Sequence, residues 1–111
     1  EISGVSMKYC EFLLNNHHLV DIYCQEVVDE KKKVVSMLKN YEVVDSNCNW
    51  IHFNNQDDNK RTKEILQKHK VLVKYCKLHH YGFRENWCRM TIQPGLSEQE
   101  FFKEIINEHN N

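Results

Sequence analysis

Apolar residues recur at helical spacing through the first third of the chain. From residue 5 to about residue 40, most intervals between apolar positions are three, four or seven residues, and this spacing predicts a buried helical stripe. A polar interruption at residues 15–18 divides the stripe, and the pattern leaves open whether the helix kinks there or a loop joins two helices. The stripe consists of Tyr9, Phe12, Leu13, Leu14, Leu19, Tyr23, Val27, Val34 and Leu38.

The middle of the chain changes to the pattern of extended segments. Residues 41–44 predict a short extended piece, and residues 49–53 alternate polar and apolar positions with a single break, which is typical of a covered strand. The apolar run at residues 71–73, flanked by two lysines, predicts a buried strand. Residues 87–92 predict another strand, after a loop at residues 81–82.

A short helix is predicted between these strands, after a polar turn. It covers about residues 59–69, and either Asp57 or Asp58 is placed to cap it by accepting free backbone N–H groups. Its apolar residues Ile65 and Leu66 are expected to face inward.

A last helix is predicted after the break at residues 93–95. Ser97 and Glu100 form a Ser-x-x-Glu capping box, in which each side chain accepts the other residue's free N–H. The apolar face of this helix consists of Phe101, Phe102, Ile105 and Ile106.

Together these elements predict a single domain that spans residues 1–111. The expected fold class is α+β: a small mixed or antiparallel sheet of three to four strands with helices packed on one face, preceded by a long N-terminal helical segment.

Charge and composition narrow the function without specifying it. Fifteen basic and sixteen acidic residues give a net charge of −1, which favours neither nucleic acid nor an anionic membrane as a partner. The basic run at residues 31–33 follows two acidic residues and predicts a solvated helix face. No apolar stretch reaches the ~20 residues needed to span a bilayer. Residues 1–9 lack the features of a signal peptide, and the start without Met is consistent with a piece of a longer protein.

The five cysteines are widely spread and form no Cys-x-x-Cys pair, which favours reduced thiols and a cytoplasmic location. The nearest approach to a metal motif is Cys76 with His79 or His80, but the second pair of ligands that a structural zinc site uses is missing. We therefore expect no bound metal.

Arg89 departs from the apolar pattern of its predicted strand. A guanidinium is not buried cheaply without an anionic partner. Two interpretations stay open at this point. Arg89 lies on the outer face of the strand, in water or paired with a glutamate, or it projects from a rigid strand to bind a carboxylate through its two-pronged donor geometry.

The segment at residues 87–92, followed by the helix with Phe101 and Phe102, resembles the C-terminal end of class I/II (fold type I) aminotransferases that use pyridoxal 5'-phosphate (PLP). The resemblance is to their histidinol-phosphate aminotransferase-like branch. Residues 46–51 resemble the Ser-x-x-Asn-Phe-hydrophobic strand of that family. Residues 69–74 resemble its Gly-Val-Leu-Val-Arg strand, and residues 27–38 resemble the stretch before its Arg-x-x-Leu helix.

The sequence also departs from the pattern of that family. Lys74 replaces an arginine, Gln93 and His69 replace glycines, and the acidic turn is altered at Leu96 and Ser97. These departures indicate a divergent member and leave its substrate open.

The resemblance implies that Arg89 binds the α-carboxylate of an amino-acid or 2-oxo-acid substrate. By the same resemblance, Lys74 contacts the distal group of the substrate and Asn49 lies near the site. The cofactor PLP would be bound by the large domain of the same chain, in a parent protein that is expected to be a homodimer. The catalytic lysine and the other cofactor-binding residues of the family have no matching motif in these 111 residues, so we expect this fragment alone to be inactive.

Two alternatives remain open from the sequence. One is a stand-alone α/β binding or regulatory module without catalysis, with Arg89 on its surface. The other is a small thiol or metal protein built on Cys76, Cys88 and the histidines.

Overall fold

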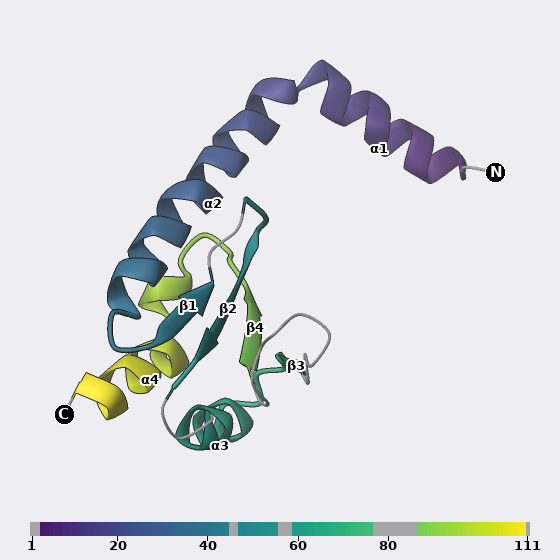
Figure 1. Ribbon diagram of the computed structural model, residues 1–111. Helices are drawn as coiled ribbons and strands as arrows, with labels where there is room; N and C mark the ends of the chain where they lie inside the picture. The colour runs from purple at the N-terminus through teal and green to yellow at the C-terminus, as the bar shows by residue number, and fades with distance from the viewer. Residues whose placement is uncertain (1–2, 45–46, 56–58, 77–86, 111) are drawn as a thin grey trace.

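The computed structural model describes residues 3–44, 47–55, 59–76 and 87–110, and Figure 1 shows one sheet with helices packed beside it and the N-terminal helix projecting away from it. In chain order the elements are α1 (Gly4–Asn15), α2 (His17–Met37), β1 (Glu42–Val44), β2 (Trp50–Asn54), α3 (Lys60–Lys68), β3 (Lys74–Cys76), β4 (Trp87–Thr91), the short 3-10 helix η2 (Leu96–Glu98) and α4 (Glu100–Asn110).

The sheet has the strand order β1-β2-β4-β3, and every neighbouring pair is antiparallel. β4 pairs with β2 although α3 and β3 lie between them in the sequence, so the two central strands are brought together by a long connection. The predicted α+β class, with a small antiparallel sheet and helices on one face, is confirmed.

One face of the sheet, here called the core face, packs against α2, α3 and α4. Ile51 and Phe53 of β2 and Cys88 of β4 lie on this face and are fully buried. The helices meet them with residues spaced as the sequence predicts, since an amphipathic helix buries one stripe. The helical part of this core consists of Val34, Leu38, Ile65, Leu66, Phe102, Ile105 and Ile106.

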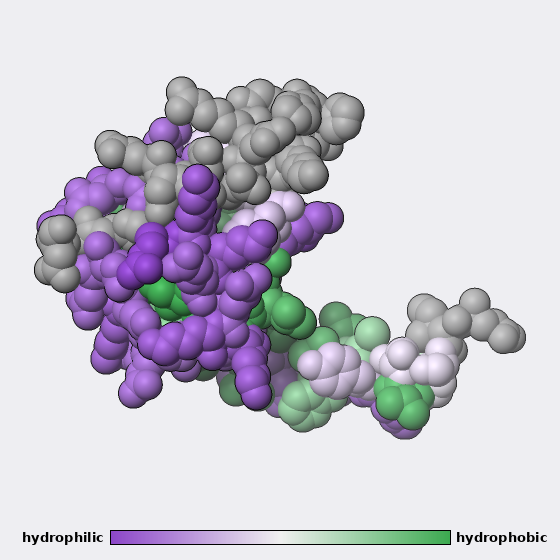
Figure 2. All heavy atoms as spheres, turned by 90° about the horizontal axis from the view of Figure 1, so that it is seen from below, coloured by the Kyte–Doolittle hydropathy of each residue, from purple (hydrophilic) through white to green (hydrophobic). Residues whose placement is uncertain are grey.

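The N-terminal part of the chain packs little against the rest of the molecule. We use the term N-terminal arm for residues 4–26, which comprise α1 and the first half of α2. The arm projects from the body in Figure 1, and Figure 2 shows hydrophobic side chains gathered along it. The radius of gyration is 16.7 Å, against roughly 13 Å for a compact chain of this length.

The predicted buried stripe is therefore wrong in its N-terminal part. Only Val34 and Leu38 of the nine stripe residues are buried, and Val27 is partly buried against the core. Helical periodicity identifies an apolar face, but it does not say whether this chain contains the surface that covers it. The exposed stripe residues include Tyr9, Phe12, Leu14, Leu19 and Tyr23.

The structure also decides between a kink and a break at residues 15–18. α1 and α2 are separate helices with Asn16 between them, and the Asn16 backbone leaves the helical region at φ −127° and ψ 36°. The side-chain amide of Asn16 donates to the carbonyl of Phe12 at 2.8 Å, and this bond ends the first helix.

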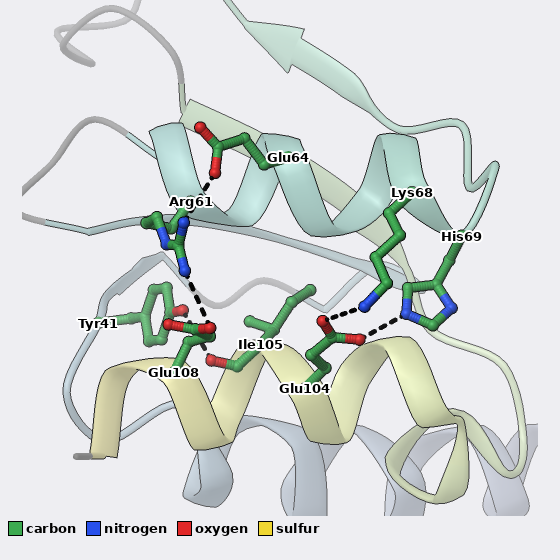
Figure 3. Close-up of polar contacts among 8 residues, drawn as sticks. All are labelled: Tyr41, Arg61, Glu64, Lys68, His69, Glu104, Ile105 and Glu108. Carbon is green, nitrogen blue, oxygen red and sulfur yellow. Dashed lines mark hydrogen bonds and ion pairs between the residues drawn. The ribbon is translucent and has the colours of Figure 1, made fainter.

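Polar contacts join α3 to α4 beside the core (Figure 3). The Glu104 carboxylate accepts hydrogen bonds from Lys68 at 2.9 Å and from His69 at 2.6 Å, and these contacts lower the pKa of Glu104. Arg61 pairs with Glu108 at 3.0 Å in the same interface. These charges pair with one another across the two helices, so they serve the fold.

One local prediction is corrected, and another falls on residues that the structure does not describe. The predicted strand at residues 71–73 lies three residues too early, because β3 begins at Lys74 and Leu72 is 98% exposed. The cap of α3 assigned to Asp57 or Asp58 lies outside the described residues. Asn59 precedes α3 in a left-handed conformation, with φ at 61°, and its amide donates to the carbonyl of Phe53 at 3.0 Å.

The predicted capping box at Ser97 is also corrected. Ser97 lies in η2, and α4 begins only at Glu100. The N–H of Ser97 instead donates to the carboxylate of Glu30 at 2.6 Å, and the Ser97 hydroxyl also hydrogen-bonds to it. Glu30 is buried in α2, so a carboxylate from a distant helix accepts the Ser97 N–H, which the local box had assigned to Glu100.

Candidate anion-binding site

The second face of the sheet, here called the outer face, carries the charged and polar side chains that could bind a ligand. Successive side chains of a strand point to opposite faces. Since Ile51 and Phe53 point to the core, Trp50 and His52 of β2 lie on the outer face. On β4 the buried Cys88 and Met90 alternate with the exposed Arg89 and Thr91.

Strand register places three basic side chains in one line across this face. His52 of β2 lies opposite Arg89 of β4, and Lys74 of β3 lies opposite Arg89 on its other side. Directly opposed residues of antiparallel strands have Cβ atoms about 5 Å apart. We call His52, Arg89 and Lys74 the cationic row.

Trp50 supports the centre of this row. The Arg89 guanidinium carbon lies 5.7 Å from the centre of the Trp50 ring, which is within the range of a cation–π contact. Trp50 is half-buried, so its ring is held by its strand. The contact limits the orientations of the guanidinium while its N–H groups remain available to a ligand.

The charges of the row also act on one another. Burial lowers the pKa of His52, and the nearby positive charge of Arg89 lowers it further. His52 is therefore neutral at physiological pH, and the permanent charge of the row comes from Arg89 and Lys74.

In the described part of the chain, neither Arg89 nor Lys74 forms an ion pair with a carboxylate. The ion pairs resolved there lie on α1, on α3, near η2 and between α3 and α4. The structure places Arg89 exposed on the outer face, as the first of the two interpretations expects, and shows no glutamate paired with it among these residues. An exposed guanidinium beside an ammonium is arranged to receive an anion.

A groove of about 720 Å³ runs beside the row. Lys74, Arg89 and Thr91 line it together with the segment at residues 71–73 and Pro94. It follows the edge of β4 past Lys74, the first residue of β3, so a ligand held by Arg89 has room to extend along the strand.

Asn49, the third residue that the resemblance placed near the site, lies elsewhere. It lines a separate groove of about 750 Å³ between α2 and residues 47–49, together with Tyr23 and Val27. Its carbonyl accepts the N–H of Ile92 at 2.7 Å. The structure thus brings Lys74 to Arg89 and leaves Asn49 on the opposite side of its strand.

Two residues of the site were missed by reasoning from the sequence. His52 and Trp50 join Arg89 only through the pairing of β2 with β4, which depends on the register. The one local signal was a histidine in phase with Trp50 on a strand whose alternate residues are apolar.

The possible metal site and the possibility of a membrane-spanning helix concern other parts of the chain. His79 and His80, the partners suggested for Cys76, lie outside the described residues. Among the residues that the structure does describe, no three His, Cys, Asp or Glu side chains lie close enough together to bind a metal ion. No described helix combines the length and the apolar character that crossing a membrane requires.

No family model matches the chain, and no curated protein matches it in sequence.

Proposed function

We propose that this chain is the small C-terminal domain of a PLP-dependent aminotransferase, in which Arg89 binds the carboxylate of the substrate. The parent enzyme transfers an amino group between an amino acid and a 2-oxo acid in the cytoplasm. The resemblance of four segments in order motivates this family, and the geometry of Arg89 supports the role of the residue.

The observation that carries the proposal is the position of Arg89. It is exposed on the outer face, it contacts the ring of Trp50, and it forms no ion pair with a described residue. A guanidinium held on a rigid strand binds a carboxylate through two parallel N–H···O bonds.

Lys74 fits the second role that the resemblance implies. It lies one strand beyond Arg89 and lines the same groove, so a substrate bound through its α-carboxylate can present a distal group to the ammonium. A lysine offers a single mobile charge where the family usually has an arginine, and this difference favours a less strictly oriented distal group.

The cationic row suits the acid group of a substrate and does not suit the cofactor ring, because it is a line of side chains on an open sheet face. PLP would be bound by the large domain of the same chain, where it supplies the electron sink for the reaction. The role of these 111 residues is to orient the substrate. We therefore expect these 111 residues alone to catalyse no transamination.

The N-terminal arm supports the presence of that large domain. An isolated helix of about 12 residues is marginal in water, and α1, with 12 residues, has none buried. Its exposed apolar side chains include Val5 at 82% and Leu14 at 75%. The large domain of the same chain, within a homodimeric parent, would cover this face.

The test uses the full-length protein that contains this chain. We expect visible absorbance from bound PLP, and we expect Arg89→Lys to raise KM for the amino-acid substrate by roughly 10- to 100-fold, since one bidentate charged contact is worth about 1.5–3 kcal/mol. The PLP absorbance of the variant should be unchanged. Arg61→Lys, the same substitution at an exposed arginine of α3 outside the groove, is the matched control and should leave KM unchanged.

Two outcomes contradict the proposal. If the full-length protein has no PLP absorbance, the chain is better described as a stand-alone α/β binding or regulatory module. If Arg89→Lys reduces cofactor binding and substrate binding equally, Arg89 does not act as a substrate clamp.

A further inference from the structure

His52 has a position in the site that the resemblance does not explain. It lies directly opposite Arg89, on the side away from Lys74, and it is partly buried. Two permanent cations already suffice to attract a substrate carboxylate. A third, titratable group in the same line therefore requires a separate account.

We propose that His52 is the proton-coupled partner of Arg89: it takes up a proton when a substrate carboxylate binds to the guanidinium. This inference rests on the proposed role of Arg89 and adds a regulation of that site. When His52 is neutral, two positive charges, those of Arg89 and Lys74, attract the carboxylate. When His52 is protonated, three positive charges attract it.

The charges around His52 explain the coupling. From β4, Arg89 faces it directly, and Lys74 of β3 lies one strand further on. From β1, Val44 lies opposite His52, and Glu42 is two residues away on the same face, opposite Asn54. Among the described residues of the neighbouring strands, the nearest charge is thus a cation, and it disfavours a second positive charge on His52.

A bound carboxylate reverses this balance. Its negative charge offsets that of Arg89 and adds an attractive charge close to the imidazole. The pKa of His52, which burial and Arg89 lower in the free site, then rises. Since binding and protonation are reciprocally linked, each must strengthen the other by the same factor.

The sign of the pH dependence follows from this linkage. Above the His52 pKa of the occupied site, binding takes up no proton and affinity is independent of pH. As the pH falls through that value, affinity rises, and it becomes constant again below the pKa of the free site. A shift of one pKa unit between the two states corresponds to a tenfold change in affinity.

Formate is a suitable probe, because it is a carboxylate without a distal group and stays ionised throughout the range that matters. We would titrate it into the 111-residue chain by NMR at constant ionic strength, between about pH 5.5 and pH 8, where histidines change charge. The His52 ring signal is identified by its loss in His52→Asn. The midpoint of its titration is then measured without formate and with saturating formate.

We expect formate to raise the His52 midpoint and to bind roughly three- to tenfold more tightly at the acidic end than at the basic end. His52→Asn should bind weakly at every pH, and His52→Lys, which carries a permanent charge, should bind tightly at every pH. His18→Asn, an exposed histidine near the start of α2, should retain the wild-type pH dependence.

The possible failures are distinguishable. If formate binds and Arg89→Met abolishes the binding, but the His52 midpoint does not move, the inference is wrong and the role of Arg89 stands. If formate does not bind even at tens of millimolar, both the carboxylate-binding role of Arg89 and the proton uptake by His52 are wrong. If the linkage is present while the full-length protein contains no PLP, the inference stands and the aminotransferase proposal is wrong.

Discussion

The two faces of β2 and β4 share one backbone but are built under different constraints. On the core face, Ile51, Phe53 and Cys88 have no measurable exposure and belong to one cluster of buried apolar side chains. On the outer face, the alternate positions hold His52 and Arg89 in register. Packing alone accounts for the first face. It does not account for the second, because Arg89 also lies opposite Lys74 of β3, and like charges placed opposite one another destabilise a sheet.

The comparison teaches which substitutions test the fold and which test the site. Residues of the core face should change stability and leave the outer face able to bind anions. Residues of the cationic row should change binding and cost little stability, or even increase it.

Phe53→Ala should have the largest effect. Phe53 is fully buried at the centre of the core, where its ring meets that of Tyr41 edge-on at 5.5 Å between centroids. Removing a buried phenyl ring loses burial and leaves a cavity, at a cost of about 3–5 kcal/mol. Urea denaturation measures this loss. His52→Ala, one residue earlier on the same strand, should cost less than about 1 kcal/mol. Equal losses would mean that the two faces do not differ as described.

Glu30→Ala should have the next largest effect. The Glu30 carboxylate accepts the N–H of Ser97 in a buried position and ties α2 to η2. Hydrogen bonds to charged groups contribute about 1.5–3 kcal/mol each, and Ser97 is left without its acceptor in the variant. Glu26→Ala, one helical turn earlier and exposed, is the matched control.

Glu30 also predicts a dependence of stability on pH. The hydrogen bond from the Ser97 side chain, the largest cause, lowers the pKa of Glu30 below its usual value of 4.5 in spite of burial. A carboxyl whose pKa is lower in the folded state stabilises the fold above its unfolded pKa, and this contribution is lost as the pH falls through the folded pKa. The stability difference between wild type and Glu30→Ala should therefore shrink below about pH 4.5. A difference that stays constant down to pH 2 would contradict the assignment.

How much of this could be predicted from the sequence differs between local and long-range features. The strands at residues 49–53 and 87–92 and the inward face of α4 were predicted, because alternation and helical spacing are local signals. The early placement of the third strand shows the limit of such a signal. Two lysines around an apolar run are typical of a buried strand, yet pairing with β4 selects Lys74–Cys76.

The sequence named two residues of the candidate site, Arg89 from its place in an apolar strand and Lys74 from the family resemblance, and strand pairing adds His52 and Trp50. Arg89 was identified because a charge in an apolar strand is locally conspicuous. Its neighbours His52 and Trp50 are about 40 residues away in the sequence, and only the antiparallel register of β2 with β4 places them beside it. The partner of Ser97 was missed for the same reason, since Glu30 lies 67 residues away. Long-range pairing has no signature in local spacing.

Lys74→Gln should have the smallest effect, and it should have the opposite sign. Lys74 lies directly opposite Arg89 and forms no ion pair with a described residue, so its removal relieves a repulsion between like charges. We expect a gain of about 0.2–1 kcal/mol in the free energy of unfolding at low salt. The gain should shrink at high salt, where exposed charges are screened. Lys32→Gln, on the exposed side of α2, should give no comparable gain. A loss of stability in Lys74→Gln at low salt would mean that Lys74 serves the fold. A salt-sensitive gain would instead show that repulsion within the cationic row lowers the free energy of unfolding. Such a loss of stability is expected of a site that binds an anion.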